Sequence, residues 1–369
     1  MLASALVEHS DVELVHVITG AAVKQTIVEN TFSEISNLII SAPNISYRND
    51  GFVWKLFNFS RYFLSILGTY KNNQSDVIFA SSSRLGTALV GAILSKILKV
   101  PYYLDLRDNI AETIYDFLPQ RYLFPLRWAV KRLHEFSIKQ ASSINTLSSK
   151  HIPYISKINK DIEIYELYHG VDKIFTVKKQ SEPIKLNEKF QNLDERILVY
   201  AGNLGFAQGL DLLLPRLSEL LPNNWVIHVY GKGNYEKQIR RSVSQLDNVI
   251  IKPPVDRSEL PRIYGNAAAL LLPLRDTPAF KNSLPSKFFE LVASGRPMMV
   301  CASGYVVSLI SEYSLDGVFV FSDENLVEIN QTLAQLDDCG FNREQFVEAW
   351  NRERLIDAQV ESILSLVRA

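Results

Sequence analysis

Short runs of apolar and β-branched residues alternate along the chain with longer stretches whose apolar residues recur at helical spacing. This alternation is typical of βαβ units, in which helices join parallel strands. The sequence therefore predicts an α/β protein built on parallel sheets. The expected strands are 12–19, 76–81, 101–106, 142–148 and 162–168, followed by 196–202, 225–231, 248–254, 268–274 and 297–303.

The polar segment 173–195 interrupts this alternation, and the chain of 369 residues is longer than one ordinary core requires. We therefore predict two parallel-sheet domains joined by a linker. A ligand is expected in the cleft between them, because such sheets bind ligands at the carboxyl ends of their strands. The predicted boundaries are 1–175 for the first domain, 176–195 for the linker, 196–345 for the second domain and 346–369 for a closing helix; the tail from residue 342 onwards reads as one long helical stretch.

The composition excludes several classes of protein. Lysine and arginine number 39 against 40 acidic residues, so the chain has no net field that would attract nucleic acid. Two cysteines, Cys301 and Cys339, are too few for a disulfide framework or a zinc cluster, which fits a reducing compartment. The sequence has no apolar run of membrane-spanning length and no signal-peptide pattern. A cytoplasmic protein is expected.

The stretch "LPSKFFELVASGRP" (284–297) predicts a short helix with a marked beginning and end. Pro285 suits the first helical turn, and Gly295 suits the position after the last turn, so the helix should cover residues 285–294. Ser286, Lys287 and Glu290 then share one side of the helix, at spacings of three and four residues.

This arrangement of a helix N-terminus, a cation and a carboxylate suits a nucleoside diphosphate. Backbone N–H groups and Lys287 would hold the phosphates, and Glu290 would accept hydrogen bonds from two ribose hydroxyls. The alternative is an ordinary capped helix with a solvated Glu290.

Glycine-rich turns follow two other predicted strands of the second domain. The segment "AGNLGFAQGLD" contains Gly202, Gly205 and Gly209, and Gly231-Lys232-Gly233 follows the next strand. Glycines allow backbone N–H groups to approach an anion. Each motif alone is weak, because tight turns and a solvated lysine would give the same pattern.

In sequence order, these pieces resemble the retaining glycosyltransferases of family 4, which have the GT-B fold. The likeness is to the branch of bacterial O-antigen and exopolysaccharide N-acetyl-L-fucosamine transferases. The matching segments are "DLRDNIAE" (105–112), "YHGVD" (168–172), "YAGNLGFAQGLD" (200–211), "VYGKG" (229–233), "LPSKFFELVASGRP" and the closing helix.

The resemblance implies two Rossmann-like domains that face each other across a cleft, with the acceptor bound by the first and the nucleotide sugar by the second. It implies a metal-independent hexosyltransferase that needs no cofactor. The donor would be a UDP-linked sugar and the acceptor a polyprenyl-diphosphate-linked glycan. The product would belong to O-antigen, capsule or exopolysaccharide biosynthesis.

The resemblance also assigns site residues. Glu290 corresponds to the second glutamate of the family's E-x7-E motif, and Asn282 stands where the first would contact the donor sugar. Gln208 replaces a common lysine near the diphosphate, so Lys287, or else Lys232 or Lys281, should supply the positive charge. The implied nucleotide-sugar-binding residues are Gly202, Asn203, Gly205, Gly231, Lys232, Gly233, Ser283, Leu284, Pro285, Ser286, Lys287 and Glu290.

In the first domain, Asp105, Asp108 and Glu112 are the candidates to orient or deprotonate an acceptor hydroxyl. Arg107 would pair with one of these carboxylates, and a structural Asp–Arg cluster remains the alternative. No covalent catalytic residue is expected, because retaining members of this fold rely on positioning and on stabilising an oxocarbenium-like transition state.

The N-terminus departs from the family, which begins with a strand and a glycine-rich loop that are missing here. That strand is central in its sheet, so its loss should leave both neighbouring strands without a partner. Either the start codon is assigned late or the chain is a shortened version.

Residues 121–140 combine cations with Tyr122, Phe124 and Trp128, as interfacial helices do. We expect peripheral contact with the cytoplasmic face of the inner membrane, the alternative being a helix that merely covers the sheet.

Two other functions share the general architecture, a nucleotide-sugar 2-epimerase and a non-catalytic partner in polysaccharide assembly. A dinucleotide dehydrogenase would need a G-x-G-x-x-G motif after a strand, and the sequence has none.

Overall fold

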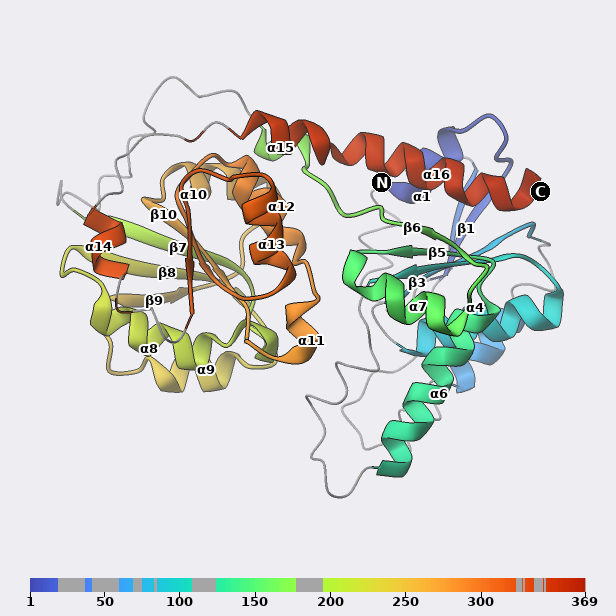
Figure 1. Cartoon of the computed structure of the whole chain (residues 1–369), viewed down its shortest axis with the longest axis horizontal. Coiled ribbons are helices and arrows are strands. Elements are labelled where there is room, and N and C mark those ends of the chain that lie inside the picture. Colours follow the sequence, from blue (N-terminus) through green and yellow to red (C-terminus); the bar gives the residue numbers. More distant parts are fainter. Residues whose placement is uncertain are drawn as a thin grey trace. The chain divides into compact units, whose positions relative to one another are not determined.

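The computed structural model forms two compact units, each described here by itself (Figure 1). Unit 1 comprises Met1–Leu167 and Arg354–Ala369, and unit 2 comprises Tyr168–Glu353. Apart from its two end residues, the predicted linker lies outside the described part of the chain. The structure describes residues 1–18, 37–41, 60–68, 75–82, 85–107, 124–176, 195–322, 327, 329–334, 341 and 343–368.

Unit 1 is built on a four-stranded parallel sheet in the order β3-β4-β5-β6. Every residue of β4 is buried, as expected for a central strand of a parallel sheet covered on both faces. The strands are β3 (Ile78–Ser82), β4 (Tyr102–Leu106), β5 (Ser143–Thr146) and β6 (Glu163–Tyr165); the helices are α4 (Leu85–Leu98), α6 (Phe124–Gln140) and α7 (Ile152–Ile158), with a 3-10 turn η1 (Ser149–His151).

A separate two-stranded parallel sheet of β1 (Val15–Ile18) and β2 (Leu38–Ser41) belongs to the same unit. Ile18 of β1 and Ile78 of β3 pack against one hydrophobic cluster around Val90. Within the described residues, however, β1 and β3 share no strand pairing.

The C-terminal tail forms two helices, so the prediction of one continuous helix is wrong. α15 (Glu344–Ala349) and α16 (Arg352–Arg368) are separated because Asn351 forms a parallel bridge with Val171. The N–H of Val171 donates to Trp350 O at 2.6 Å, which fixes the break. α16 then packs on unit 1, where Tyr103 Oη and Ser362 Oγ are 2.9 Å apart.

Unit 2 contains a six-stranded parallel sheet in the order β12-β11-β10-β7-β8-β9. The strand order reverses between β7 and β10, and in open α/β sheets ligands bind at this switch point, beyond the carboxyl ends of the strands. The strands are β7 (Arg196–Asn203), β8 (Trp225–Lys232), β9 (Val249–Lys252), β10 (Ala269–Pro273), β11 (Met298–Cys301) and β12 (Val318–Phe321).

All ten strands expected from the sequence are present, whereas β2 and β12 were not predicted.

Helices lie on both sides of the sheet of unit 2 (Figure 1). They are α8 (Leu210–Leu220), α9 (Glu236–Ser242), α10 (Leu260–Gly265), α11 (Pro278–Lys281), α12 (Ser286–Ala293), α13 (Tyr305–Glu312) and α14 (Ile329–Ala334), with the 3-10 turns η2 (Lys173–Phe175), η3 (Phe206–Gln208) and η4 (Arg257–Glu259); unit 1 also has α1 (Leu2–Glu8). Among the helices that the structure describes, none combines the length and apolar character that crossing a membrane requires.

α12 confirms the helix predicted at 285–294, with Pro285 preceding the helix as its N-cap. Gly295 follows the last turn with φ +66°, a conformation that glycine adopts without strain. Phe288 and Phe289 on its buried face contact the aromatic rings of Phe346 and Trp350, with centroids 5.4–5.9 Å apart. This packing fixes the helix that carries Lys287 and Glu290.

The carboxyl ends of β7 and β8 approach each other so closely that only glycine fits at one position. A Cβ added to Gly231 would lie 1.9 Å from the carbonyl oxygen of Gly202, a contact with backbone that no side-chain movement can relieve. Gly231 therefore has a structural reason to be glycine.

We expect Gly231→Ala to lower the free energy of unfolding by more than about 2 kcal/mol, because it strains this backbone contact. Gly265 provides the matched control, since an added Cβ there meets no atom within 4 Å. Gly265→Ala should leave stability unchanged or raise it by up to about 1 kcal/mol. Urea unfolding of both variants tests the prediction, which equal stabilities would contradict.

Two histidines are buried in unit 1 where α6 meets η1 and α7. His134 is stacked on Tyr154, with centroids 5.9 Å apart, and neither of its ring nitrogens has a hydrogen-bond partner in the described part of the chain. Burial lowers the pKa of His134 to about 4, and the nearby His151 lowers it further. Burial likewise lowers the pKa of His151 to about 4.

The chain should therefore lose stability as the pH falls from about 6.5 towards 4. In this range His134 binds a proton in the unfolded state but stays neutral in the folded state. At pH 5 this one histidine should cost about 2 kcal/mol. His134→Phe, which keeps a ring against Tyr154, should reduce the difference in unfolding free energy between pH 7.5 and pH 5. An unchanged pH dependence in that variant would contradict the assignment.

Candidate functional site

The residues predicted to bind the nucleotide gather at the switch point of unit 2, at the carboxyl ends of β7 and β10. Gly202 and Asn203 end β7, and the segment 283–287 leads into α12 after β10. The loops after these two strands are joined, because the N–H of Arg275 donates to Ala207 O at 2.8 Å. The topology thus brings together two motifs that lie about eighty residues apart in the sequence.

Glu290 is buried, with only 3% of its surface exposed. Its Oε1 accepts a hydrogen bond from Arg257 Nη1 at 2.5 Å. Its Oε2 is buried and has no hydrogen-bond partner among the described residues. The carboxylate therefore has one oxygen that is occupied and one whose hydrogen-bonding capacity is unused.

Lys287 lies beside this unused oxygen, with Nζ 3.9 Å from Oε2 of Glu290. Its side chain runs over Gly202, where an added Cβ would lie 2.5 Å from Lys287 Cε. Burial lowers the pKa of Lys287, and the charge of Glu290 opposes that shift. The lysine thus places a cation between the end of β7 and the first turn of α12.

The sequence did not reveal the cation that contacts Glu290 most directly. Arg257 begins η4 after β9, and its second terminal nitrogen lies 3.3 Å from Oδ2 of Asp172. The same oxygen accepts a hydrogen bond from Arg352 at 2.7 Å. Asp172 belongs to the "YHGVD" segment, to which the sequence gave no individual role.

A second buried polar atom lies near Glu290. Tyr264 is 1% exposed, and its hydroxyl has no hydrogen-bond partner within the described parts of the chain. Burial raises the pKa of this hydroxyl, and the charge of Glu290 raises it further. An unpaired buried polar group costs about 1–3 kcal/mol, so both groups would gain from a ligand that offers hydrogen bonds.

In the glycine-rich loop after β7, a side chain already occupies one backbone amide. The N–H of Gly205 donates to Oε1 of Gln208 at 3.1 Å. Gln208, which stands where the resemblance would place a lysine, thus stabilises the turn itself.

The cation against this loop is Arg275, which the sequence did not single out. Its guanidinium lies 4.1 Å from the ring centroid of Phe206 and donates to Phe206 O at 2.7 Å. It also pairs with Asp211 at 2.6 Å. Of the lysines proposed as alternatives, Lys281 pairs with Asp276 at 3.1 Å, and Lys232 is exposed at the end of β8.

The remaining predicted residues of unit 2 lie close to this group. Asn282 follows the short helix α11, and the N–H of Ser283 donates to Phe280 O at 3.1 Å. Leu284 is buried, whereas Ser286 at the start of α12 is exposed. An added Cβ at Gly233 would lie 2.3 Å from Leu204 O, so this glycine, like Gly231, has a packing role.

Of the three acceptor-side candidates, only Asp105 belongs to the described residues. Its carboxylate is part of a hydrogen-bond network within unit 1. Its two oxygens accept hydrogen bonds from Ser81 and Asn145, each at 2.8 Å, and from Arg107 at 3.1 Å. This geometry favours the structural Asp–Arg cluster for Asp105, and a catalytic role stays a prediction. Asp108 and Glu112 lie outside the described residues.

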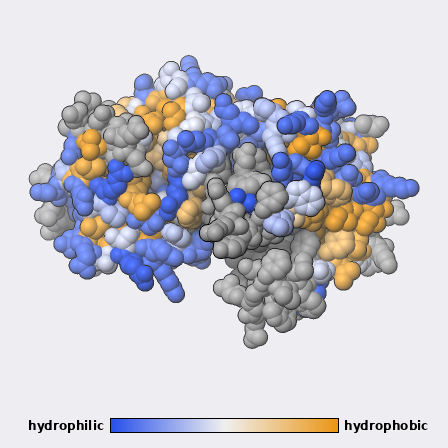
Figure 2. All heavy atoms as spheres, turned by 60° about the horizontal axis from the view of Figure 1, so that its bottom comes forward, coloured by the Kyte–Doolittle hydropathy of each residue, from blue (hydrophilic) through white to orange (hydrophobic). Residues whose placement is uncertain are grey.

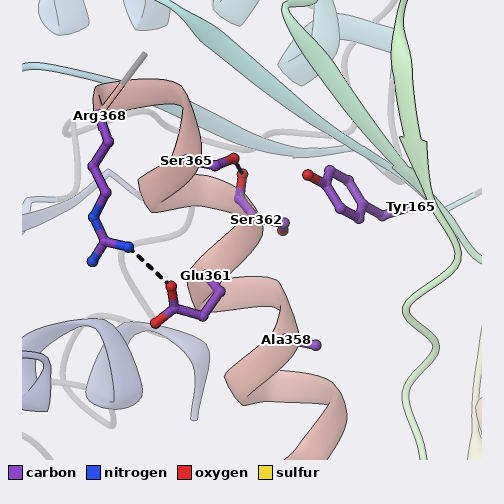
Figure 3. A pocket seen from close by; sticks show the side chains of 6 residues that line it. All are labelled: Tyr165, Ala358, Glu361, Ser362, Ser365 and Arg368. Atoms are coloured by element: carbon purple, nitrogen blue, oxygen red, sulfur yellow. Dashed lines mark hydrogen bonds and ion pairs between the residues drawn. The ribbon is translucent and has the colours of Figure 1, made fainter.

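Unit 1 also contains a cavity of about 640 Å³ between β6 and α16 (Figure 3). Tyr165 lines it from β6, and the α16 residues that line it include Glu361 and Arg368, which form an ion pair at 3.1 Å. None of the predicted site residues lines this cavity. In the parts of the chain that the structure describes, no group of three or more His, Cys, Asp or Glu side chains could hold a metal ion.

The arrangement in unit 2 can bind a ligand that combines negative charge with hydroxyl groups. Lys287 offers a positive charge, while Glu290 Oε2 offers a buried acceptor for hydroxyl donors. Arg257 and Arg275 lie in the loops that follow β9 and β10, at the same edge of the sheet. Charged residues in such loops were the signal that could have identified them from the sequence.

Comparison with known proteins adds information on the family and the fold. Residues 195–337 match the family model "Glycosyl transferases group 1". None of the curated proteins matches the sequence.

Among solved structures, the chain is similar to Anabaena HepE in complex with UDP and glucose, with a TM-score of 0.67, 15% identity and coverage of 99% of this chain and 94% of that one. It is similar to the lipopolysaccharide outer core galactosyltransferase WaaB (TM-score 0.56, 14% identity, coverage 95% and 98%). It is also similar to sucrose-phosphate synthase from Thermosynechococcus elongatus (TM-score 0.59, 14% identity, coverage 96% and 93%). The fold is therefore α/β of the GT-B type, with a Rossmann-like parallel sheet in each unit.

Proposed function

We propose that this chain is a glycosyltransferase that uses a UDP-linked sugar as donor. The observation that carries the proposal is the buried Glu290, whose Oε2 has no hydrogen-bond partner in the described chain and lies 3.9 Å from Lys287 Nζ at the switch point. Oε2 would accept hydrogen bonds from the ribose hydroxyls, and Lys287 would neutralise the diphosphate. The HepE structures in complex with UDP and with UDP-glucose support this choice of nucleotide.

The proposed reaction transfers the sugar with retention of configuration. Lys287 and the N-terminus of α12 would stabilise the negative charge that develops on the leaving diphosphate. Asn282 would position the donor sugar through hydrogen bonds, in place of the carboxylate that the resemblance leads one to expect. No metal ion is required by this scheme, because the lysine and backbone amides carry the charge.

The proposed acceptor is a polyprenyl-diphosphate-linked glycan, and the product is a cell-surface polysaccharide. The resemblance of the sequence motifs to O-antigen and exopolysaccharide transferases supports this choice. The structural likeness to WaaB, a lipopolysaccharide outer core galactosyltransferase, is consistent with it.

Glu290→Gln should weaken UDP binding about 10-fold to 150-fold, because hydrogen bonds to a charged group contribute about 1.5–3 kcal/mol. Glutamine keeps the shape of the side chain, so the melting temperature should change little. Calorimetric titration of UDP into both proteins measures the effect. Glu259→Gln, an exposed carboxylate on η4, is the control and should bind UDP like the wild type.

A second ligand sharpens this experiment. The wild type should bind UDP more tightly than 2'-deoxy-UDP, and Glu290→Gln should discriminate less between them. If Glu290→Gln and the wild type bind UDP equally well, the ribose assignment is wrong. A larger thermal stabilisation by NAD than by UDP would argue against the transferase itself.

We also propose that α6 contacts an anionic membrane. Trp128, Arg132, Glu135 and Lys139 follow one another along the helix at spacings of four, three and four residues, so they share its outer face. Trp128 is 56% exposed, and the guanidinium of Arg132 lies 5.6 Å from its ring centroid. An aromatic anchor beside cations is the composition of interfacial helices.

A groove between α6 and α7 extends this surface. It has a volume of about 530 Å³, and Lys139 of α6 and Lys157 of α7 line it; neither forms an ion pair within the described residues. Figure 2 shows hydrophobic side chains gathered on part of the surface of unit 1, at its right-hand side. The exposed large apolar residues of this unit include Leu64 and Ile97.

Lys139→Glu combined with Lys157→Glu should reduce co-sedimentation with phosphatidylglycerol vesicles several-fold, since each basic residue near an anionic surface contributes about 1 kcal/mol. Binding of the wild type should also fall as salt rises. The matched control is Lys237→Glu with Arg241→Glu, two exposed cations one turn apart on α9 of unit 2. Equal losses in both double variants would place the contact elsewhere.

A further inference from the structure

We infer that Arg257 is a positioning residue that fixes which oxygen of Glu290 is offered to the ligand. The inference rests on the proposed nucleotide site and extends it to a residue in a different loop. Arg257 Nη1 donates to Oε1 of Glu290 at 2.5 Å, whereas Oε2 accepts no hydrogen bond from the described residues.

Three contacts restrain the guanidinium of Arg257. Besides Glu290, it contacts Asp172 at 3.3 Å and lies 5.0 Å from the ring centroid of Phe175. Phe175 in turn stacks on Tyr264, with centroids 5.9 Å apart. A charged plane held between two carboxylates and an aromatic face has little freedom to rotate, although 45% of the side chain is exposed.

Asp172 is itself held in place, so it can serve as a fixed support. Its Oδ1 accepts the N–H of Ile174 at 3.2 Å, and its Oδ2 accepts Arg352 Nη1 at 2.7 Å. Arg352 is anchored further by donating to His169 O at 2.8 Å. The orientation of Glu290 is therefore determined by a chain of contacts that ends in the backbone.

The side chain of Glu290 is only 4% exposed and its Oε2 is buried, so a ligand must displace one neighbouring side chain. Lys287 is the side chain that can move, because its ammonium lies 3.9 Å from Oε2, beyond hydrogen-bond distance. Once displaced, the ammonium would contact the phosphates. Arg257 stays in place, because displacing it would break the hydrogen bond to Oε1. Arg257 thus acts through Glu290 and favours recognition of the ribose hydroxyls.

Arg257→Gln should weaken UDP binding about 10-fold and lower the preference for UDP over 2'-deoxy-UDP, since Glu290 would no longer hold one orientation. Arg257→Lys, which can still pair with Glu290, should recover part of both effects. The exposed Arg262→Gln on α10 is the matched control and should leave both unchanged. Melting curves identify any variant that fails to fold.

The double variant Arg257→Gln with Glu290→Gln decides whether the arginine acts through the glutamate. If it does, the double variant binds UDP no more weakly than Glu290→Gln alone. Additive losses would overturn the inference, and so would unchanged or tighter UDP binding by Arg257→Gln while Glu290→Gln binds weakly. Wild-type binding by Glu290→Gln would instead refute the proposed ribose contact, and the role of Arg257 with it.

Discussion

The site in unit 2 depends on one constraint, that an ionised carboxylate buried on a helix needs a paired cation. Glu290 is 3% exposed and follows two phenylalanines that are fully buried. Removing such a charge from water costs several kcal/mol unless a partner compensates for it. Arg257 supplies the direct hydrogen bond and Lys287 a second positive charge. η4 carries Arg257 to Glu290, and Asp172 contacts the same guanidinium.

α12 can hold Glu290 in place because one face of the helix packs in the core while the other carries the polar side chains. Phe288 and Phe289 pack among aromatic side chains from α15 and the residue after it, which fixes the helix axis. Arg343 adds hydrogen bonds to Val292 O at 3.2 Å and to Arg296 O at 3.0 Å, which anchor its C-terminal end. With the helix fixed, the polar side chains on its other face can be held in defined orientations.

The parts that could be predicted from the sequence are those that local pattern determines. Apolar runs identified ten strands, and Pro285 with Gly295 bounded α12 to within one residue. The missed parts depend on contacts between distant segments. Arg257 meets Glu290 across 33 residues, and the break between α15 and α16 depends on Val171. β12 was missed although its four residues, Val318–Phe321, are all apolar.

The two units differ in how much hydrogen-bonding capacity remains at the predicted site residues. In unit 1, Asp105 uses both oxygens within the protein. In unit 2, Oε2 of the predicted residue Glu290 is buried without a partner in the described chain, and so is the hydroxyl of Tyr264, which the sequence did not single out. Buried polar groups normally have partners, so an unsatisfied pair in one place is a cost that a ligand can offset. The unsatisfied carboxylate oxygen of Glu290 lies beside a lysine at the switch point of a parallel sheet. This location is the physical reason for proposing a nucleotide site in unit 2.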